Sequence, residues 1–177
     1  MRLTPVTRGA LAPNQQQVLD AIEQGPRAKG RPGIGLIGPF GVWVRAPGVG
    51  GPIQKVGEAI RFSTSLASNV QEVAICTVGA FHHSKFEFST HKALAIQAGV
   101  SEVCLDLLRD GEEPGFNGDE GLSYKIAREM LTEHGISDTT YSLGLARFTE
   151  TGMIELVATV GYYCLISLTL NAFKIPL

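Results

Sequence analysis

The feature that most limits the possible folds of this chain is the helical spacing of its apolar residues from residue 51 to the end. Apolar residues there recur at intervals of three and four, as one buried face of an α-helix requires. Ser68, with Gln71 three residues on, forms a capping-box pattern. Segments of strand length with alternating β-branched residues are missing, so we expect an all-α fold of about seven or eight helices. The expected helices are 15–24, 52–62, 69–80, 82–98, 102–110, 119–134, 138–150 and 153–173.

The first fifty residues are rich in glycine and proline, and their apolar pieces are short. A segment of this kind wraps a core more readily than it forms one. A chain of 177 residues is long enough to bury a core without disulfides or metals. We therefore expect a single domain over 1–177, with 1–50 as an N-terminal extension packed on it.

The charges of the chain are nearly balanced and form no run of one sign. Lys and Arg number 15 and Asp and Glu number 17, which gives a formal net charge of −2. Nucleic acid and anionic membrane surfaces favour proteins with a basic stripe, so neither is an expected partner. The apolar run 153–170 is long enough to span a membrane, but it contains Glu155 and Gly161. A helix buried in the core or between subunits is expected there.

The cysteines and the N-terminus both indicate a cytoplasmic protein. Cys76, Cys104 and Cys164 are odd in number, scattered, and form no CxxC pair, as expected for reduced thiols. The N-terminal stretch has no apolar segment of the kind found in signal peptides, so no secretory signal is expected.

The stretch "FHHSKFEFSTH", residues 81–91, carries the strongest signal of chemistry. On a helix over 82–98, Ser84, Glu87 and His91 stand at i, i+3 and i+7 and share one face, with His83 beside them. Glu72 is a lone acid on the apolar preceding helix. If the two helices fold back on each other near residue 79, Glu72 approaches His91.

We interpret these residues first as a proton-transfer site, and two other interpretations are possible from the sequence. Glu87, His91 and Glu72 could ligate a metal, but no HxxxH pair lies on the shared face, and we expect no metal. Alternatively, Glu87 and His91 form a surface ion pair, and Glu72 is a carboxylate favoured at a helix start.

The stretch "QEVAICTVGAFHHSKFEFSTHKALAIQAGVS" resembles the core motif of the carboxymuconolactone decarboxylase / AhpD-like alkylhydroperoxidase superfamily. The similarity continues through "LVATVGYYCLISLTLNAFKIPL" and covers most of residues 36–177. The peroxidase branch has a glutamate, a CxxC pair and a histidine four residues on. The resemblance places Glu72 at the glutamate, Ser84 and Glu87 at the two cysteines, and His91 at the histidine. Both thiols are missing, so a thiol peroxidase is disfavoured.

The resemblance implies an AhpD-like helical domain of the decarboxylase-like branch. The implied activity is that of a cofactor-independent lyase, acting on a small carboxylated lactone or related acid of aromatic compound catabolism. Isomerisation or hydration would use the same groups. Trimers or hexamers are common in the superfamily, so a homo-oligomer is expected. A thiol-dependent peroxidase and a non-catalytic small-ligand binder are the alternatives.

For a lyase of this type we expect His91 to act as general acid and base, because its pKa lies near the working pH. Glu72 is expected to orient His91, and Glu87 to act as a second acid and base. Ser84 and His83 are candidate hydrogen-bond donors to the substrate. Three polar residues of the apolar C-terminal helix either complete the pocket or bond within the fold: Tyr162, Tyr163 and Asn171.

Overall fold

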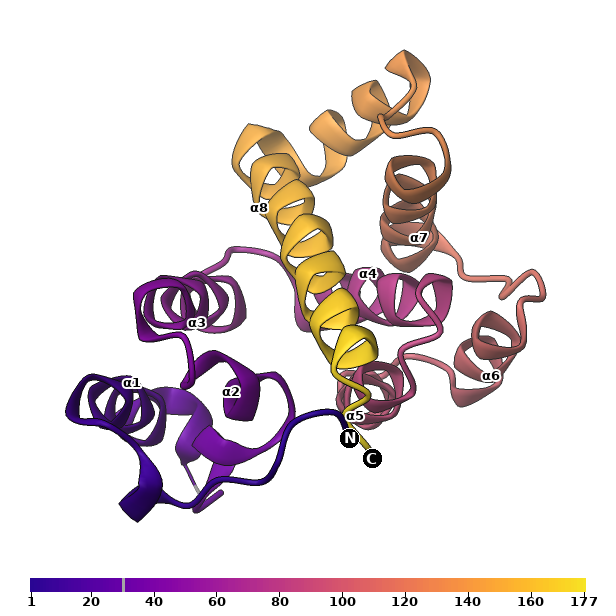
Figure 1. Cartoon of the computed structure of the whole chain (residues 1–177). Coiled ribbons are helices and arrows are strands. Elements are labelled where there is room, and N and C mark those ends of the chain that lie inside the picture. Colours follow the sequence, from indigo (N-terminus) through magenta and orange to yellow (C-terminus); the bar gives the residue numbers. More distant parts are fainter. Residues whose placement is uncertain (30) are drawn as a thin grey trace. The chain divides into compact units, whose positions relative to one another are not determined.

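The structure is a computed structural model that describes residues 1–29 and 31–177 (Figure 1). It is 73% helical, and the described residues contain eight α-helices and no strand, which confirms the all-α prediction. The helices are α1 (Pro13–Gln24), α2 (Gly38–Trp43), α3 (Pro47–Phe62), α4 (Ser68–Phe81), α5 (Lys85–Gln97), α6 (Glu102–Asp110), α7 (Gly118–Thr132) and α8 (Asp138–Ala172). Short 3-10 turns lie at Arg8–Ala10, Pro26–Ala28 and Ile34–Leu36.

The main differences from the expected helices are four, and the first is that α3 begins at Pro47 rather than at residue 52. The six residues of α2 are too few to display a helical period, so this helix was not expected. α5 begins at Lys85 rather than at 82, because His83 has a left-handed backbone (φ 50°) and Ser84 is extended. The break expected at Gly152 lies instead at Thr149 (φ 66°, ψ 174°), inside the α8 segment.

The chain divides into two compact units. The first unit comprises Met1–Ser63 and Thr169–Leu177, and the second comprises Thr64–Leu168. A buried apolar cluster forms the core of the first unit: Leu11, Val18, Leu19, Ile22, Ile34 and Val44. The single domain and the 1–50 extension stay predictions.

The second unit is built around α4, which packs against α5, α6 and α7. Every residue of α4 from Val70 to Gly79 is buried, so this helix needs apolar or paired side chains on all sides. Its core cluster joins α4, α5 and α6: Val73, Cys76, Phe88, Ala95, Val100, Leu105 and Leu108.

By length and composition α8 is apolar enough to cross a membrane. Half of its most apolar window is buried within the structure, and core helices of soluble proteins have the same properties. The helix is therefore weak evidence for a membrane span.

α4 and α5 approach each other closely at Gly79. A Cβ atom there would lie 3.2 Å from the backbone nitrogen of Phe88 and 3.3 Å from its Cα. Backbone atoms cannot move aside as a flexible side chain can, so Gly79→Ala is expected to lower the free energy of unfolding by about 1–3 kcal/mol. Urea denaturation measures the change.

Gly161 on α8 is the matched control, because a Cβ atom there meets nothing within 4 Å. Gly161→Ala is expected to raise the free energy of unfolding by up to about 1 kcal/mol through helix propensity. If Gly79→Ala stabilises the protein as Gly161→Ala does, the close approach of α4 and α5 does not constrain the fold.

Candidate active site

The centre of the candidate site is His91, whose imidazole lies between two carboxylates. Its Nδ1 lies 2.6 Å from Oε2 of Glu72, on α4, and its Nε2 lies 3.0 Å from Oε1 of Glu87, one turn earlier on α5. None of the three residues is more than 6% exposed. The interpretation as a surface ion pair is therefore wrong, because the contact lies in the interior of the second unit.

Local structure explains how α4 and α5 present these groups. Glu72 is the only ionisable side chain along the buried run of α4, apart from the thiol of Cys76. Glu87 lies in the first turn of α5, where the helix dipole stabilises a carboxylate. The Glu87 carboxylate reaches forward to His91, so the i,i+4 spacing on α5 accounts for one of the two carboxylate contacts of His91.

The two carboxylates determine the charge of His91. Burial alone would lower the pKa of the imidazole, but Glu87 and Glu72 outweigh it, and the pKa is raised above its ordinary value of 6.5. The protonated ring can donate Nδ1–H to Glu72 and Nε2–H to Glu87. The site therefore holds a proton between two carboxylates.

The raised pKa of His91 makes stability depend on pH. The charged imidazole stabilises the fold fully below pH 6.5, its ordinary pKa, and this contribution is lost as the pH rises through the folded pKa. The free energy of unfolding is expected to fall as the pH rises above 6.5, and denaturant titrations at several pH values measure it. In His91→Gln the same fall should be absent. A stability that rises equally in both proteins over this window would contradict the assignment.

The thiol of Cys76 lies close to the same carboxylates. Burial raises its pKa well above the ordinary value, and the negative charges of Glu72 and Glu87 raise it further. A thiolate is the nucleophilic form of cysteine, so Cys76 is held in its unreactive form.

Two tyrosines of α8 pack beside the imidazole. The Tyr163 ring lies edge-on to His91, with centroids 4.9 Å apart and an interplanar angle of 81°. Tyr162 packs against Tyr163, with centroids 5.5 Å apart. Which residues of α8 face His91 depends on the rotation of this helix about its axis, and the sequence does not determine that rotation.

Ser84 and His83, adjacent in sequence, lie in different surroundings. Ser84 is buried, and its Oγ has no hydrogen-bond partner in the described part of the chain, although this residue caps α5. His83 is exposed and lines a separate cavity of about 320 Å³, together with Phe81, Tyr124 and Arg128. Asn171 is exposed and belongs to the first unit, so its role stays a prediction.

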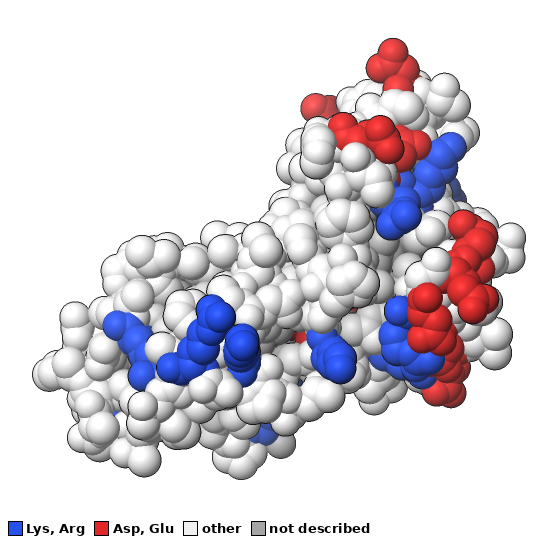
Figure 2. Space-filling model, turned by 45° about the vertical axis from the view of Figure 1, so that its right-hand side comes forward, with Lys and Arg blue, Asp and Glu red and all other residues white. Residues whose placement is uncertain are grey.

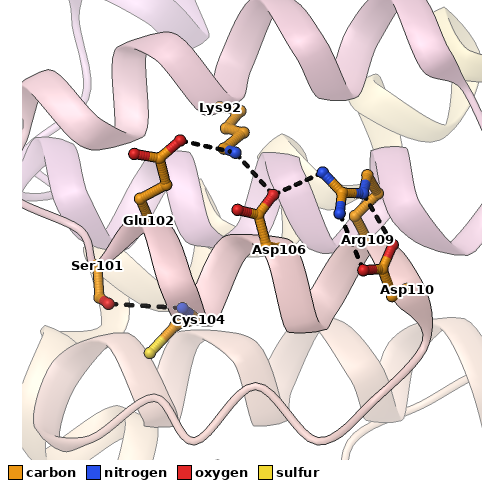
Figure 3. A network of polar contacts seen from close by, with 7 residues as sticks. All are labelled: Lys92, Ser101, Glu102, Cys104, Asp106, Arg109 and Asp110. Carbon is orange, nitrogen blue, oxygen red and sulfur yellow. Dashed lines mark hydrogen bonds and ion pairs between the residues drawn. The ribbon is translucent and has the colours of Figure 1, made fainter.

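A chain of ion pairs joins α5 to α6 directly after His91 (Figure 3). Lys92 Nζ lies 2.7 Å from Asp106 and 3.0 Å from Glu102, and Arg109 binds Asp106 and Asp110 on the outer side of α6. Lys92 and Asp106 are partly buried, and Glu102, Arg109 and Asp110 are exposed, so their contribution to stability is modest. They link α5, the helix that carries His91, to α6.

No family model matches this chain, and no curated protein matches it. Within residues 1–29 and 31–177, no group of three or more His, Cys, Asp or Glu side chains is arranged to hold a metal ion. What the fold and the site define is an all-helical protein with a buried carboxylate–imidazole–carboxylate centre.

Proposed function

We propose that this protein is a cofactor-independent lyase of the carboxymuconolactone decarboxylase type, which acts on a small carboxylated lactone or a related acid. The observation that carries the proposal is the buried contact of His91 with Glu72 and Glu87. A histidine held between two carboxylates can release and recover a proton near neutral pH, as this reaction requires. The resemblance of residues 71–101 to the superfamily motif supplies the substrate class.

In the proposed reaction the substrate carboxylate leaves as CO₂. Its bonding electron pair passes through a C=C bond into the lactone carbonyl, which forms an enolate. His91 protonates this enolate at carbon, directly or through Glu87, and then recovers a proton from solvent. Glu72 holds Nδ1–H throughout, which keeps the ring orientation and stabilises the imidazolium. The buried Oγ of Ser84 is the proposed hydrogen-bond donor to the substrate.

The thiol-dependent peroxidase is the weaker alternative. Cys76, Cys104 and Cys164 are all free, and Cys76 is the one whose thiol lies near the site. Its raised pKa opposes the thiolate that attack on a peroxide requires. Peroxide reduction that disappears when all three cysteines are replaced by serine would favour this alternative.

The same proposal includes a cytoplasmic protein that assembles as a homo-oligomer, a trimer or a hexamer. Three free cysteines fit a reducing compartment. α8 keeps an apolar face exposed at Ile154, Val157, Leu165 and Leu168, which fits burial against another subunit. Light scattering of the purified protein measures the assembly, and a monomer at all concentrations would contradict it.

The activity is tested with 4-carboxymuconolactone and a small panel of related lactone acids. We expect loss of substrate absorbance, with release of one CO₂ per molecule, in buffer without added metal or cofactor. His91→Gln is the control that should lack turnover while remaining folded by circular dichroism. Binding of these acids without CO₂ release or isomerisation would show that the non-catalytic alternative is correct.

A further inference from the structure

The near-neutral net charge of the chain conceals a strong separation of charge between its two units. The first unit has nine Lys and Arg against three Asp and Glu, a net charge of +6. The second unit has six Lys and Arg against fourteen Asp and Glu, a net charge of −8. The two units together give the net charge of −2 of the whole chain. Figure 2 shows blue side chains without red neighbours over the part that holds α1 to α3, whereas the red side chains gather over the second unit.

The positive charge of the first unit is not neutralised within that unit. Asp20 and Glu23 both bind Arg8, and Glu58 pairs with Lys55 at 3.6 Å, so all three carboxylates are already engaged. Three further arginines donate to backbone carbonyl oxygens: Arg2, Arg27 and Arg45. Lys29 and Arg31 are exposed and have no carboxylate partner in the described part of the chain. An acidic surface would provide the missing counter-charge.

The first unit also carries an exposed apolar stripe, on α3. It consists of Val49, Pro52, Val56, Ala59 and Phe62, which recur at helical spacing on one face; we call it the α3 face. Val49, Val56 and Phe62 expose half or more of their surface. Arg27 ties the basic segment to this helix, because its guanidinium donates to the Gln54 carbonyl at 3.1 Å and lies 6.0 Å over the Phe62 ring.

The second unit has a surface with the opposite charge and a similar apolar content. The first part of α8, residues 138–150, is exposed except at Thr140 and Gly144 and partly at Phe148; we call it the 138–150 segment. Its Tyr141, Leu143 and Leu145 expose between 39% and 53% of their surface. Asp138 and Glu150 at its two ends have no basic partner within the described residues, and Asp138 shares a helix face with Tyr141 and Leu145.

We infer that the α3 face of one copy docks on the 138–150 segment of a second copy. Apolar side chains would cover each other in the centre, and Lys29 and Arg31 would face Asp138 and Glu150 at the rim. Nucleic acid would use the cations but not the apolar stripe. Because two different surfaces meet, the contact is head-to-tail, and the proposed trimer or hexamer requires a rotation between copies that closes into a ring. The inference rests on the proposed homo-oligomer and adds a second contact to it, beside the one proposed for the exposed face of α8 at Ile154, Val157, Leu165 and Leu168.

Charge reversal of the full chain tests the contact. Lys29→Glu/Arg31→Glu and Asp138→Lys/Glu150→Lys are each expected to weaken self-association about tenfold or more, measured by sedimentation velocity over a range of concentrations. When the two variants are mixed, each supplies the surface that the other lacks, and association should return. Lys125→Glu reverses an exposed cation of the second unit and should leave association unchanged.

Several results would overturn the inference. One is a wild-type protein that is monomeric at all concentrations, and another is an oligomer that neither reversal weakens. Reversals that lower the free energy of unfolding without changing association would show that the surfaces act within one chain. A monomer that binds anionic lipid vesicles or nucleic acid through Lys29 and Arg31 would assign the surface to a different partner. Association is measured without substrate, so its outcome is independent of whether lyase activity is found.

Discussion

Replacing His91 with alanine is expected to lower the free energy of unfolding by about 3–5 kcal/mol, because it leaves two buried carboxylates without their shared cation. The side chains of Glu72 and Glu87 are almost wholly inaccessible, so solvent cannot replace the imidazole. Turnover of the lactone acid is expected to fall by about 10²–10⁴-fold, the range for loss of a general acid. Denaturant unfolding at neutral pH and a CO₂-release assay measure the two effects.

The control is His134→Asn. His134 is exposed and has a left-handed backbone (φ 60°), which asparagine tolerates. This variant should keep both stability and turnover. If His91→Ala does not fold, His91→Gln keeps one donor group and allows the activity to be measured. A His91→Ala protein as stable and as active as the wild type would show that the buried centre has neither role.

The second large effect is expected from the carboxylates, which should separate activity from stability. Glu72→Gln and Glu87→Gln each keep the shape of the side chain but remove a negative charge from a site with two carboxylates and one imidazolium. Turnover is expected to fall by about 10²–10⁴-fold in each variant. The free energy of unfolding is expected to change little, because a one-to-one charge balance replaces a net negative one.

The pH dependence of the two variants gives the sharper test. Both carboxylates raise the pKa of His91, so each replacement should lower that pKa, as measured by the imidazole resonances in NMR titrations. The activity profile should move to lower pH together with the pKa. A profile that does not move in Glu87→Gln would show that Glu87 has no part in the proton transfer.

Most of the helices could be predicted from the sequence, because helix formation depends on residues within one or two turns. α4, α6 and α7 lie within three residues of the expected positions. α2 could not be predicted because six residues contain no full repeat. The left-handed turn at His83 depends on the tight connection between α4 and α5. The helix breaks at Thr149 and not at Gly152, so the nearest glycine in the sequence does not mark the break.

The site was predictable where it lies on one helix and less so where it joins different helices. The contact of Glu87 with His91 follows from their i,i+4 spacing on α5, whereas Ser84 precedes this helix, and the unpartnered state of its Oγ depends on what surrounds it. His83, expected beside the other three, points to a different cavity because its backbone leaves the helix.

The sequence by itself therefore determined the helical class of this protein and the shared face of Glu87 and His91, since neighbours in the chain decide both. Only the tertiary structure decided that Glu72, 19 residues away, binds His91 in the interior, and that Tyr163 covers the ring. Packing between helices also decided that the carboxylates raise the pKa of His91. The tertiary structure also showed that a chain with a net charge of −2 consists of a basic unit and an acidic unit. The units are defined by contacts between residues, so composition alone does not reveal them.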